Sequence, residues 1–168
     1  MTPQKIQQPI FTPLKILNEK EKKELENKLN KQFGTEIIPG TLVQKGKERI
    51  FLFSGNLTPK EIKKIEEIVV VERVGIYFAK ILEDKNEEKI KLSIEGTQIL
   101  KNQIKKNIFE LPEELVDNWM KGQDLQIKTG ERGILIIKHK DDFLGSGKAS
   151  EEKISNFIPK NRRLREKN

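Results

Sequence analysis

The sequence predicts an α+β protein in two parts: a small N-terminal α/β unit, then a C-terminal mixed β-barrel with short helices. Two helix patterns alternate with β-rich segments in the first half, whereas many short strands separated by turns fill the second half. A charge run at residues 83–89 divides the halves and is the best candidate for a domain boundary. We therefore expect domains at residues 14–87 and 88–168, after an extended, poorly ordered lead-in at residues 1–13.

The first half is expected to hold two helices, each begun by a capping residue. Asn18 precedes the first, in which apolar residues recur at helical spacing until Gly34 ends it. Thr58 precedes the second, where Pro59 occupies the first position and Glu61 completes a capping box. The residues of this second helix expected to face inward are Ile62, Ile65 and Ile68.

The sheet of the first half is read from runs of β-branched and aromatic residues. Its strands are expected at residues 36–43 (interrupted by Pro39-Gly40), 49–54, 69–71 and 74–82, with turns at 45–48 and 72–73.

The second half follows a different pattern of short strands and brief helices. Strands are expected at residues 90–92, 108–111, 124–127 and 133–139 and around Leu144 and Ile158, with helices at 93–100 and 113–120. About 80 residues of this kind are typical of a compact, partly closed barrel.

Composition excludes several classes of function. The chain has no Cys, which excludes disulfides, thiolate metal sites and cysteine nucleophiles and is compatible with a cytoplasmic protein. No apolar run approaches 18 residues and no secretory h-region opens the chain, so we expect no membrane contact. The net charge of +7 favours an anionic partner such as nucleic acid. Residues 1–88 carry +2 of this charge and residues 89–168 carry +5.

Four segments of the second half resemble a PUA domain, an RNA-binding module named after pseudouridine synthases and archaeosine transglycosylases. They are Ser93–Gln98, the helix-Gly-x-Asp element at Trp119–Leu125, the Leu-Gly-x-Gly element at Leu144–Lys148, and Asn156–Arg163. The resemblance covers roughly residues 88–165. Its Pro-Lys-x-Arg-Arg ending is most similar to the archaeal variant joined to, or partnered with, Nol/Nop/Sun-type RNA cytosine-5 methyltransferases.

The first half more loosely resembles the α/β unit that precedes PUA domains in small ribosome-assembly factors. The segments that carry this likeness are Pro13–Leu17, the strand Arg49–Ser54 and the strand Gly75–Phe78. The 168 residues contain no cofactor-sized domain and no Cys for a covalent cytosine adduct, so methylation is not expected of them. We predict no catalytic residue, no metal and no cofactor.

The resemblance and the charge pattern together give a set of candidate RNA-binding residues. They are Thr97, Gln98, Lys101, Lys121, Lys138, Lys140, Gly145, Ser146, Gly147, Lys148, Lys160, Arg162, Arg163 and Arg165. The guanidinium and ammonium groups of the C-terminal end suit phosphate, and the Gly-Ser-Gly turn would let an RNA backbone approach closely.

Each candidate has a plain structural alternative. The turn at residues 145–148 is no P-loop, since Asp142 and Ala149 stand where glycine and Ser or Thr are needed, but it could be a simple bend. Gly122 alone would explain the loop at Lys121 as a helix end, and the basic end could be a solvated tail. His139 has no second histidine with which to hold a metal, and Trp119 is expected in the core.

Two functions of different kinds remain open at this stage. The first is a non-catalytic protein that binds structured ribosomal or transfer RNA in ribosome biogenesis or RNA modification. The second is an adaptor for an RNA methyltransferase or ribosome-assembly proteins, which predicts an exposed apolar patch around Phe51, Phe53 and Ile76. An enzymatic role has no support beyond scattered carboxylates.

Overall fold

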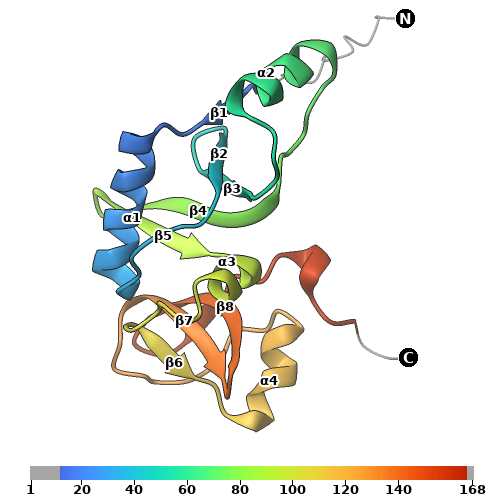
Figure 1. Cartoon of the computed structure of the whole chain (residues 1–168). Helices are drawn as coiled ribbons and strands as arrows, with labels where there is room; N and C mark the ends of the chain where they lie inside the picture. Colours follow the sequence, from blue (N-terminus) through green and yellow to red (C-terminus); the bar gives the residue numbers. More distant parts are fainter. Residues whose placement is uncertain (1–11, 166–168) are drawn as a thin grey trace, which may run out of the picture.

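A computed structural model describes residues 12–165 of the chain, so most of the lead-in predicted at residues 1–13 lies outside the described residues. The elements are, in chain order, β1 (Leu14–Ile16), α1 (Glu19–Phe33), β2 (Thr41–Lys45), β3 (Arg49–Phe53), α2 (Pro59–Ile68), β4 (Ile76–Asp84), β5 (Glu87–Leu92), α3 (Ile94–Ile99), β6 (Ile108–Glu110), α4 (Glu113–Met120), β7 (Gly133–His139), β8 (Asp142–Ala149), β9 (Ile154–Asn156) and the 3₁₀ helix η1 (Lys160–Arg162). The first sheet with α1 and α2 forms the upper part of Figure 1, and the second sheet with α4 forms the lower part.

The first half is a five-stranded sheet with the order β1-β2-β3-β4-β5, antiparallel throughout. Helix α1 packs on one face of this sheet through Leu25, Leu29 and Phe33. Asn18 and Glu21 form the capping box at its start, and Gly34, with a φ of 76°, ends it. The predicted limits of this helix are confirmed.

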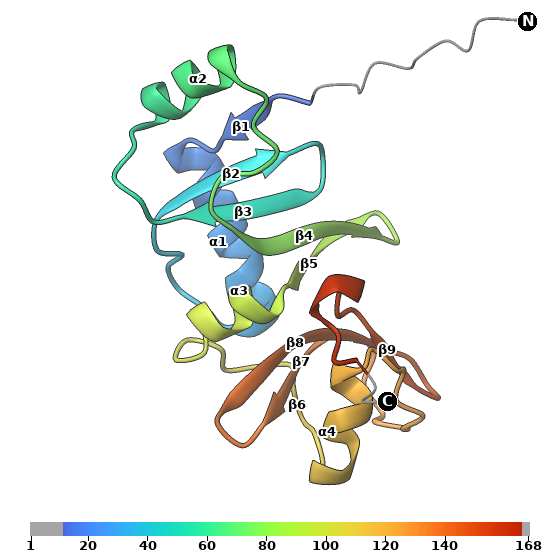
Figure 2. The same cartoon turned by 90° about the vertical axis from the view of Figure 1, so that its right-hand side faces the viewer.

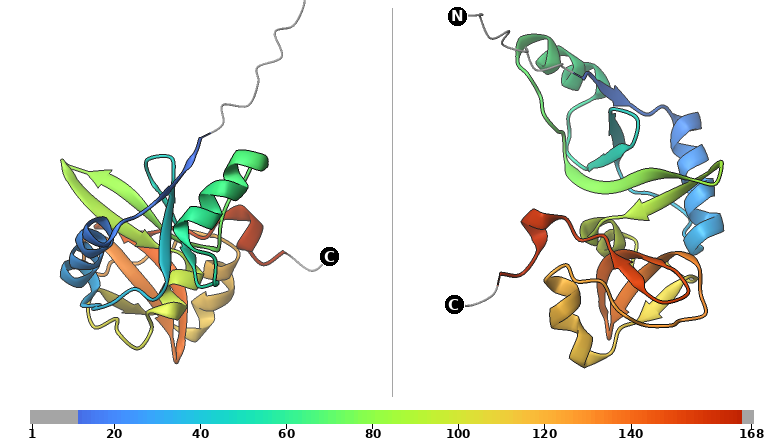
Figure 3. Two further views of the ribbon diagram at one scale, coloured as in Figure 1. Left: turned by 45° about the horizontal axis from the view of Figure 1, so that its top comes forward. Right: turned by 180° about the vertical axis from the view of Figure 1, so that it is seen from behind.

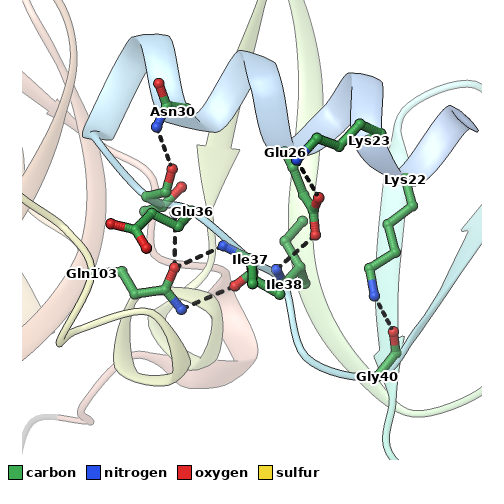
Figure 4. A network of polar contacts seen from close by, with 10 residues as sticks. Lys22, Lys23, Glu26, Asn30, Glu36, Ile37, Ile38, Gly40 and Gln103 are labelled. Carbon is green, nitrogen blue, oxygen red and sulfur yellow. Dashed lines mark hydrogen bonds and ion pairs between the residues drawn. The ribbon is translucent and has the colours of Figure 1, made fainter. Parts of the chain in front are cut away.

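The strand expected from residue 36 begins only at Thr41, because side chains take the backbone groups that a neighbouring strand would need. Gln103, just after α3, accepts hydrogen bonds from the N–H groups of Glu36 and Ile37 and donates one to the Ile37 carbonyl (Figure 4). Glu26 of α1 accepts from the Ile38 N–H at 3.0 Å. Residues 36–38 are therefore bound to side chains of α1 and of the segment after α3 rather than paired in the sheet.

Helix α2 has the predicted capping box of Thr58 and Glu61, but its inward face is narrower than expected. Ile62 is buried, whereas Ile65 is 40% and Ile68 82% exposed. Residues 69–71 form no strand either. Val71 and Val74 instead pack on a small cluster of Leu14, Val43 and Phe51, on the sheet face away from α1.

The second half is a mixed sheet with the order β6-β7-β8-β9, in which only β6 and β7 run parallel. The fold class is α+β as predicted, but no closed barrel forms within residues 12–165. The strand expected at 124–127 is a single bridge between Leu125 and Ile154, and the last strand ends at Asn156, before Ile158. Helix α4 lies against this sheet (Figure 3).

The charge run at residues 83–89 forms the end of the β4–β5 hairpin, with Lys85 and Asn86 at positive φ. Both strands belong to the first sheet, so the chain passes to the second sheet only between Leu92 and Ile108. The domain limits at 87 and 88 stay a prediction.

One hydrophobic core joins the two sheets. Strand β7 alternates: Ile134 and Ile136 pack in the cluster that contains α1 and the first sheet, whereas Leu135 and Ile137 pack in the cluster around α4 and Trp119. Helix α3 lies between the sheets. Gly96 approaches the backbone of β4 so closely that a Cβ there would meet the Phe78 carbonyl.

Candidate nucleic-acid interface

The C-terminal end is held against α4 rather than left as a loose tail. The Leu164 N–H donates to the Met120 carbonyl at 2.9 Å, and Nε of Arg163 donates to the Ile158 carbonyl at 3.0 Å. The Arg163 side chain lies directly on Gly122, which has a φ of 84° and no room for a Cβ. Arg163 therefore anchors the end of the chain.

The exposed cations of this end are Lys160, Arg162 and Arg165. Lys160 and Arg162 lie on η1, which sits between the two sheets (Figure 2). Arg162 forms an ion pair with Glu95 of α3. Among the described residues, Lys160 forms no ion pair, so its ammonium group is presented to solvent.

The residues expected to admit an RNA backbone at α3 and β8 are buried between those elements. Thr97 accepts a hydrogen bond from the Gly145 N–H at 3.2 Å, and the Ser146 hydroxyl donates to the Leu92 carbonyl at 2.8 Å. Gly147 packs so closely on Trp119 and Ile154 that a Cβ would collide with both side chains. These contacts tie β8 to the first sheet and to α4.

Two neighbours of this group lie nearer the surface. Gln98 is half-buried and donates to the Phe143 carbonyl at 2.9 Å, whereas Lys101 is exposed beyond the end of α3. Lys121 is half-buried at the end of α4 and pairs with Asp117 at 2.7 Å.

Lys138 and Lys140 lie together at the β7–β8 turn, among carboxylates. Lys138 pairs with Glu110 at 3.5 Å, and Lys140 pairs with Glu113, where its hydrogen bond and charge lower the pKa of the Glu113 carboxyl. His139 lies between the Leu111 carbonyl and Glu113. The acids neutralise much of the positive charge at this turn.

Lys148 lies at the other end of β8 and pairs with Asp84 of the β4–β5 hairpin at 3.2 Å. The adjoining pocket, of about 510 Å³, has three basic and three acidic residues in its lining, so it is a poor attractor for anions. Its charged residues are Asp84, Lys85, Arg132, Lys148, Glu151 and Glu152.

A larger groove, of about 830 Å³, runs between η1 and the first sheet and was missed by sequence reasoning. Five Lys or Arg side chains and two Glu side chains line it. The basic ones are Lys45, Arg49, Arg73, Lys80 and Arg162. Four of the five come from the first half, where we predicted no binding residue. The signal was the hairpin at residues 45–49, which brings Lys45 opposite Arg49.

The structure thus separates the predicted residues into five places: α3 with its buried contact to β8, the end of α4, the β7–β8 turn, the far end of β8, and the C-terminal end that includes η1. Only η1 combines exposed cations with a neighbouring groove that is rich in positive charge.

Residues 106–164 form a PUA domain, and such a domain implies RNA binding. They match the family described as the methyltransferase RsmF PUA domain, which confirms the predicted resemblance and its methyltransferase-associated type. The match covers about a third of the chain and begins after α3, so the Ser93–Gln98 segment lies outside it. Among curated proteins, none matches this sequence.

The matched family concerns the RNA-binding module, and no catalytic methyltransferase domain is found in these 168 residues. Within residues 12–165 there is no cluster of three or more acids or histidines placed to hold a metal ion. In the same part of the chain, none of the helices is both long enough and apolar enough to cross a membrane.

Proposed function

We propose that this protein binds structured ribosomal or transfer RNA without catalysing a reaction, in ribosome biogenesis or RNA modification. The observation that carries this proposal is the PUA domain at residues 106–164, whose last residues include the exposed cations of η1. Phosphate contacts by Lys160 and Arg162 would supply affinity and orient the RNA.

The test is binding of the full chain to ribosomal and transfer RNA fragments across a salt series. The variant Lys160→Ala/Arg162→Ala removes two exposed cations and keeps Arg163, whose loss would disturb the contact with Gly122. Each lost phosphate contact lowers the salt slope by about 0.7, so the pair is expected to cost roughly tenfold in affinity at 0.15 M salt.

The matched control is Lys20→Ala/Lys31→Ala, which removes two exposed cations from α1, on the far side of the first sheet from η1. It is expected to bind RNA within about twofold of wild type, since these charges are remote from η1. Equal losses in both variants would reduce the effect to net charge and contradict a site at η1.

A second function, that of a protein adaptor, is favoured by one observation. The predicted apolar patch is wrong in part, because Phe51 is only 6% exposed, although Ile76 is 42% exposed. The exposed apolar side chains gather instead at the end of α2, where Ile68, Val69 and Val70 are all more than half exposed. Salt-independent, weak RNA binding by wild type would favour this second function.

A further inference from the structure

The first sheet carries a row of cations on the face away from α1. Lys45 on β2 is paired with Arg49 on β3, Arg49 with Lys80 on β4, and Lys80 with Lys91 on β5. Residues directly opposite each other in antiparallel strands project from the same face. Four positive side chains therefore stand side by side across four strands, and at about 4.8 Å per strand the row is about 14 Å long.

Two carboxylates neutralise part of this row: Glu48 interacts with both Lys80 and Arg49, and Glu66 interacts with Lys45. Lys80 pairs with Glu48 at 2.7 Å, and Lys45 donates to the Glu72 carbonyl. Among the residues that the structure describes, the Arg49 guanidinium makes neither an ion pair nor a hydrogen bond.

Lys91, at the end of the row, is half-buried and lies 4.4 Å from the centre of the Phe157 ring. Burial lowers the pKa of its ammonium group, and the charge of Lys80 lowers it further. Like charges opposite each other destabilise a sheet, so this row costs stability unless an external anion lies along it.

The row opens onto the groove that η1 closes from the other side. Arg162 and Asn161 of η1 face Lys45, Arg49 and Lys80 across it, and Arg73 adds a further cation. Tyr77 also lines the groove, with its ring centre 5.8 Å from that of Phe51. A linear series of cations beside an aromatic ring is the combination by which proteins hold a single strand of nucleic acid.

We propose that this groove binds the sugar-phosphate backbone of a single-stranded RNA segment. RNA held at η1 would continue across the first sheet, with successive phosphates along the cation row and a base against Tyr77. This inference rests on the proposed function and extends it to the half of the molecule outside the matched PUA domain. The three cations of the row that line the groove, Lys45, Arg49 and Lys80, span about 10 Å, which suits a chain of phosphates better than one phosphate group.

The test compares two RNAs: a hairpin with single-stranded extensions at both ends, and the same hairpin without them. The variant Arg49→Gln/Arg73→Gln removes two groove cations. It is expected to lose roughly tenfold in affinity for the extended RNA at 0.15 M salt, from a slope of about 0.7 per contact. Its affinity for the blunt hairpin is expected to stay unchanged, whereas Lys160→Ala/Arg162→Ala weakens both. The control Lys20→Gln/Lys31→Gln is expected to bind both RNAs as tightly as wild type does.

Failure of this inference is distinguishable from failure of the proposed function. If wild type binds the extended hairpin and Arg49→Gln/Arg73→Gln binds it equally well, the groove assignment alone is overturned. If wild type binds neither RNA, both the groove assignment and the proposed RNA-binding function are overturned. Binding of a poly-glutamate peptide that is lost in the variant, without RNA binding, would assign the groove to an acidic protein partner and overturn the RNA proposal.

A thermal melt without RNA separates a binding role from a structural one. The variant Arg49→Gln removes a charge that repels Lys45 and Lys80 and loses only a weak attraction to the exposed Glu48, so its melting temperature is expected to equal or exceed that of wild type. A lower melting temperature would make Arg49 a structural residue and contradict the proposal.

Discussion

Asp124 holds the loop after α4 against β9. Its carboxylate accepts hydrogen bonds from the Asn156 N–H at 2.8 Å and from Lys153 at 2.7 Å. Asn156 in turn donates to the Trp119 carbonyl at 2.7 Å. Asp124, the Asp of the helix-Gly-x-Asp element, therefore has a structural role. Asn156, which begins the basic C-terminal segment, has a structural role too.

The Lys153 and Asn156 hydrogen bonds lower the pKa of the Asp124 carboxyl. The stabilisation that they provide is fully present above the unfolded value, near 3.9, and is lost as the pH falls through the lowered folded value. Asp124→Asn is therefore expected to lower the free energy of unfolding by about 1 kcal/mol at pH 7 and by progressively less below pH 4.

Denaturant unfolding of the Asp124→Asn variant at pH 7 and pH 3 measures this difference. Glu152→Gln is the control, because Glu152 and its partner Lys128 are both largely exposed and their pair contributes little. A loss that is the same at both pH values would contradict the assigned ion pair.

At this scale the sequence could not distinguish exposed from buried candidates. Thr97 and Ser146 carry hydroxyls that could meet RNA, yet in the fold both are buried and bonded to backbone groups. Only the packing of α3 against β8 decides this, and no local pattern records it. The charge at η1 was visible in the sequence, because a cluster of Lys and Arg needs no tertiary information to be noticed.

The two N-terminal helices have similar caps but unequal packing. Helix α1 places Leu25, Leu29 and Phe33 in the shared core. Helix α2 buries only Ile62 and is tied to the edge strand β1 by Lys63 and Glu66, which bind the backbone of Leu14. Similar capping boxes therefore begin both helices, although α1 packs in the shared core and α2 lies at the edge of the first sheet.

This contrast predicts different effects for equivalent substitutions. Asn18→Ala is expected to lower the free energy of global unfolding by about 1 kcal/mol, measured by denaturant titration. Thr58→Ala is expected to change it by less than about 0.5 kcal/mol and to speed amide exchange within α2, because this helix opens locally. Equal global losses would contradict a peripheral α2.

Helix limits could be predicted because caps and helical spacing are local. Strand limits were less certain, because residues 36–38 have strand composition but bind Gln103 and Glu26 instead. The cation row was also missed, because it depends on tertiary structure. Its four members are scattered along the chain, and only the strand register brings them together.

The whole molecule is organised around the core that both sheets share. Ile134, Ile136 and Phe143 of the second sheet belong to the same cluster as the residues of α1 and the first sheet. The sole Tyr lies in the first half and the sole Trp in the second, so each half carries its own optical probe.

A shared core predicts a single unfolding transition. Denaturant curves followed by Trp119 fluorescence and Tyr77 absorbance are expected to coincide. Ile136→Ala, in the second sheet, is expected to lower the free energy of unfolding by about 2–5 kcal/mol and to shift both curves together. Two separate transitions, or a shift of the Trp119 curve alone, would contradict this account.

The two-sided burial of β7 also limits how this molecule can be rearranged by recombination. Residues 106–164 are not expected to fold well when fused alone to another protein, because Ile134, Ile136 and Phe143 would then be exposed. A new host would have to supply its own apolar cover for that face. The two halves are thus expected to be inherited together, and substitutions on the core side of β7 to be accompanied by compensating ones in α1 and β5.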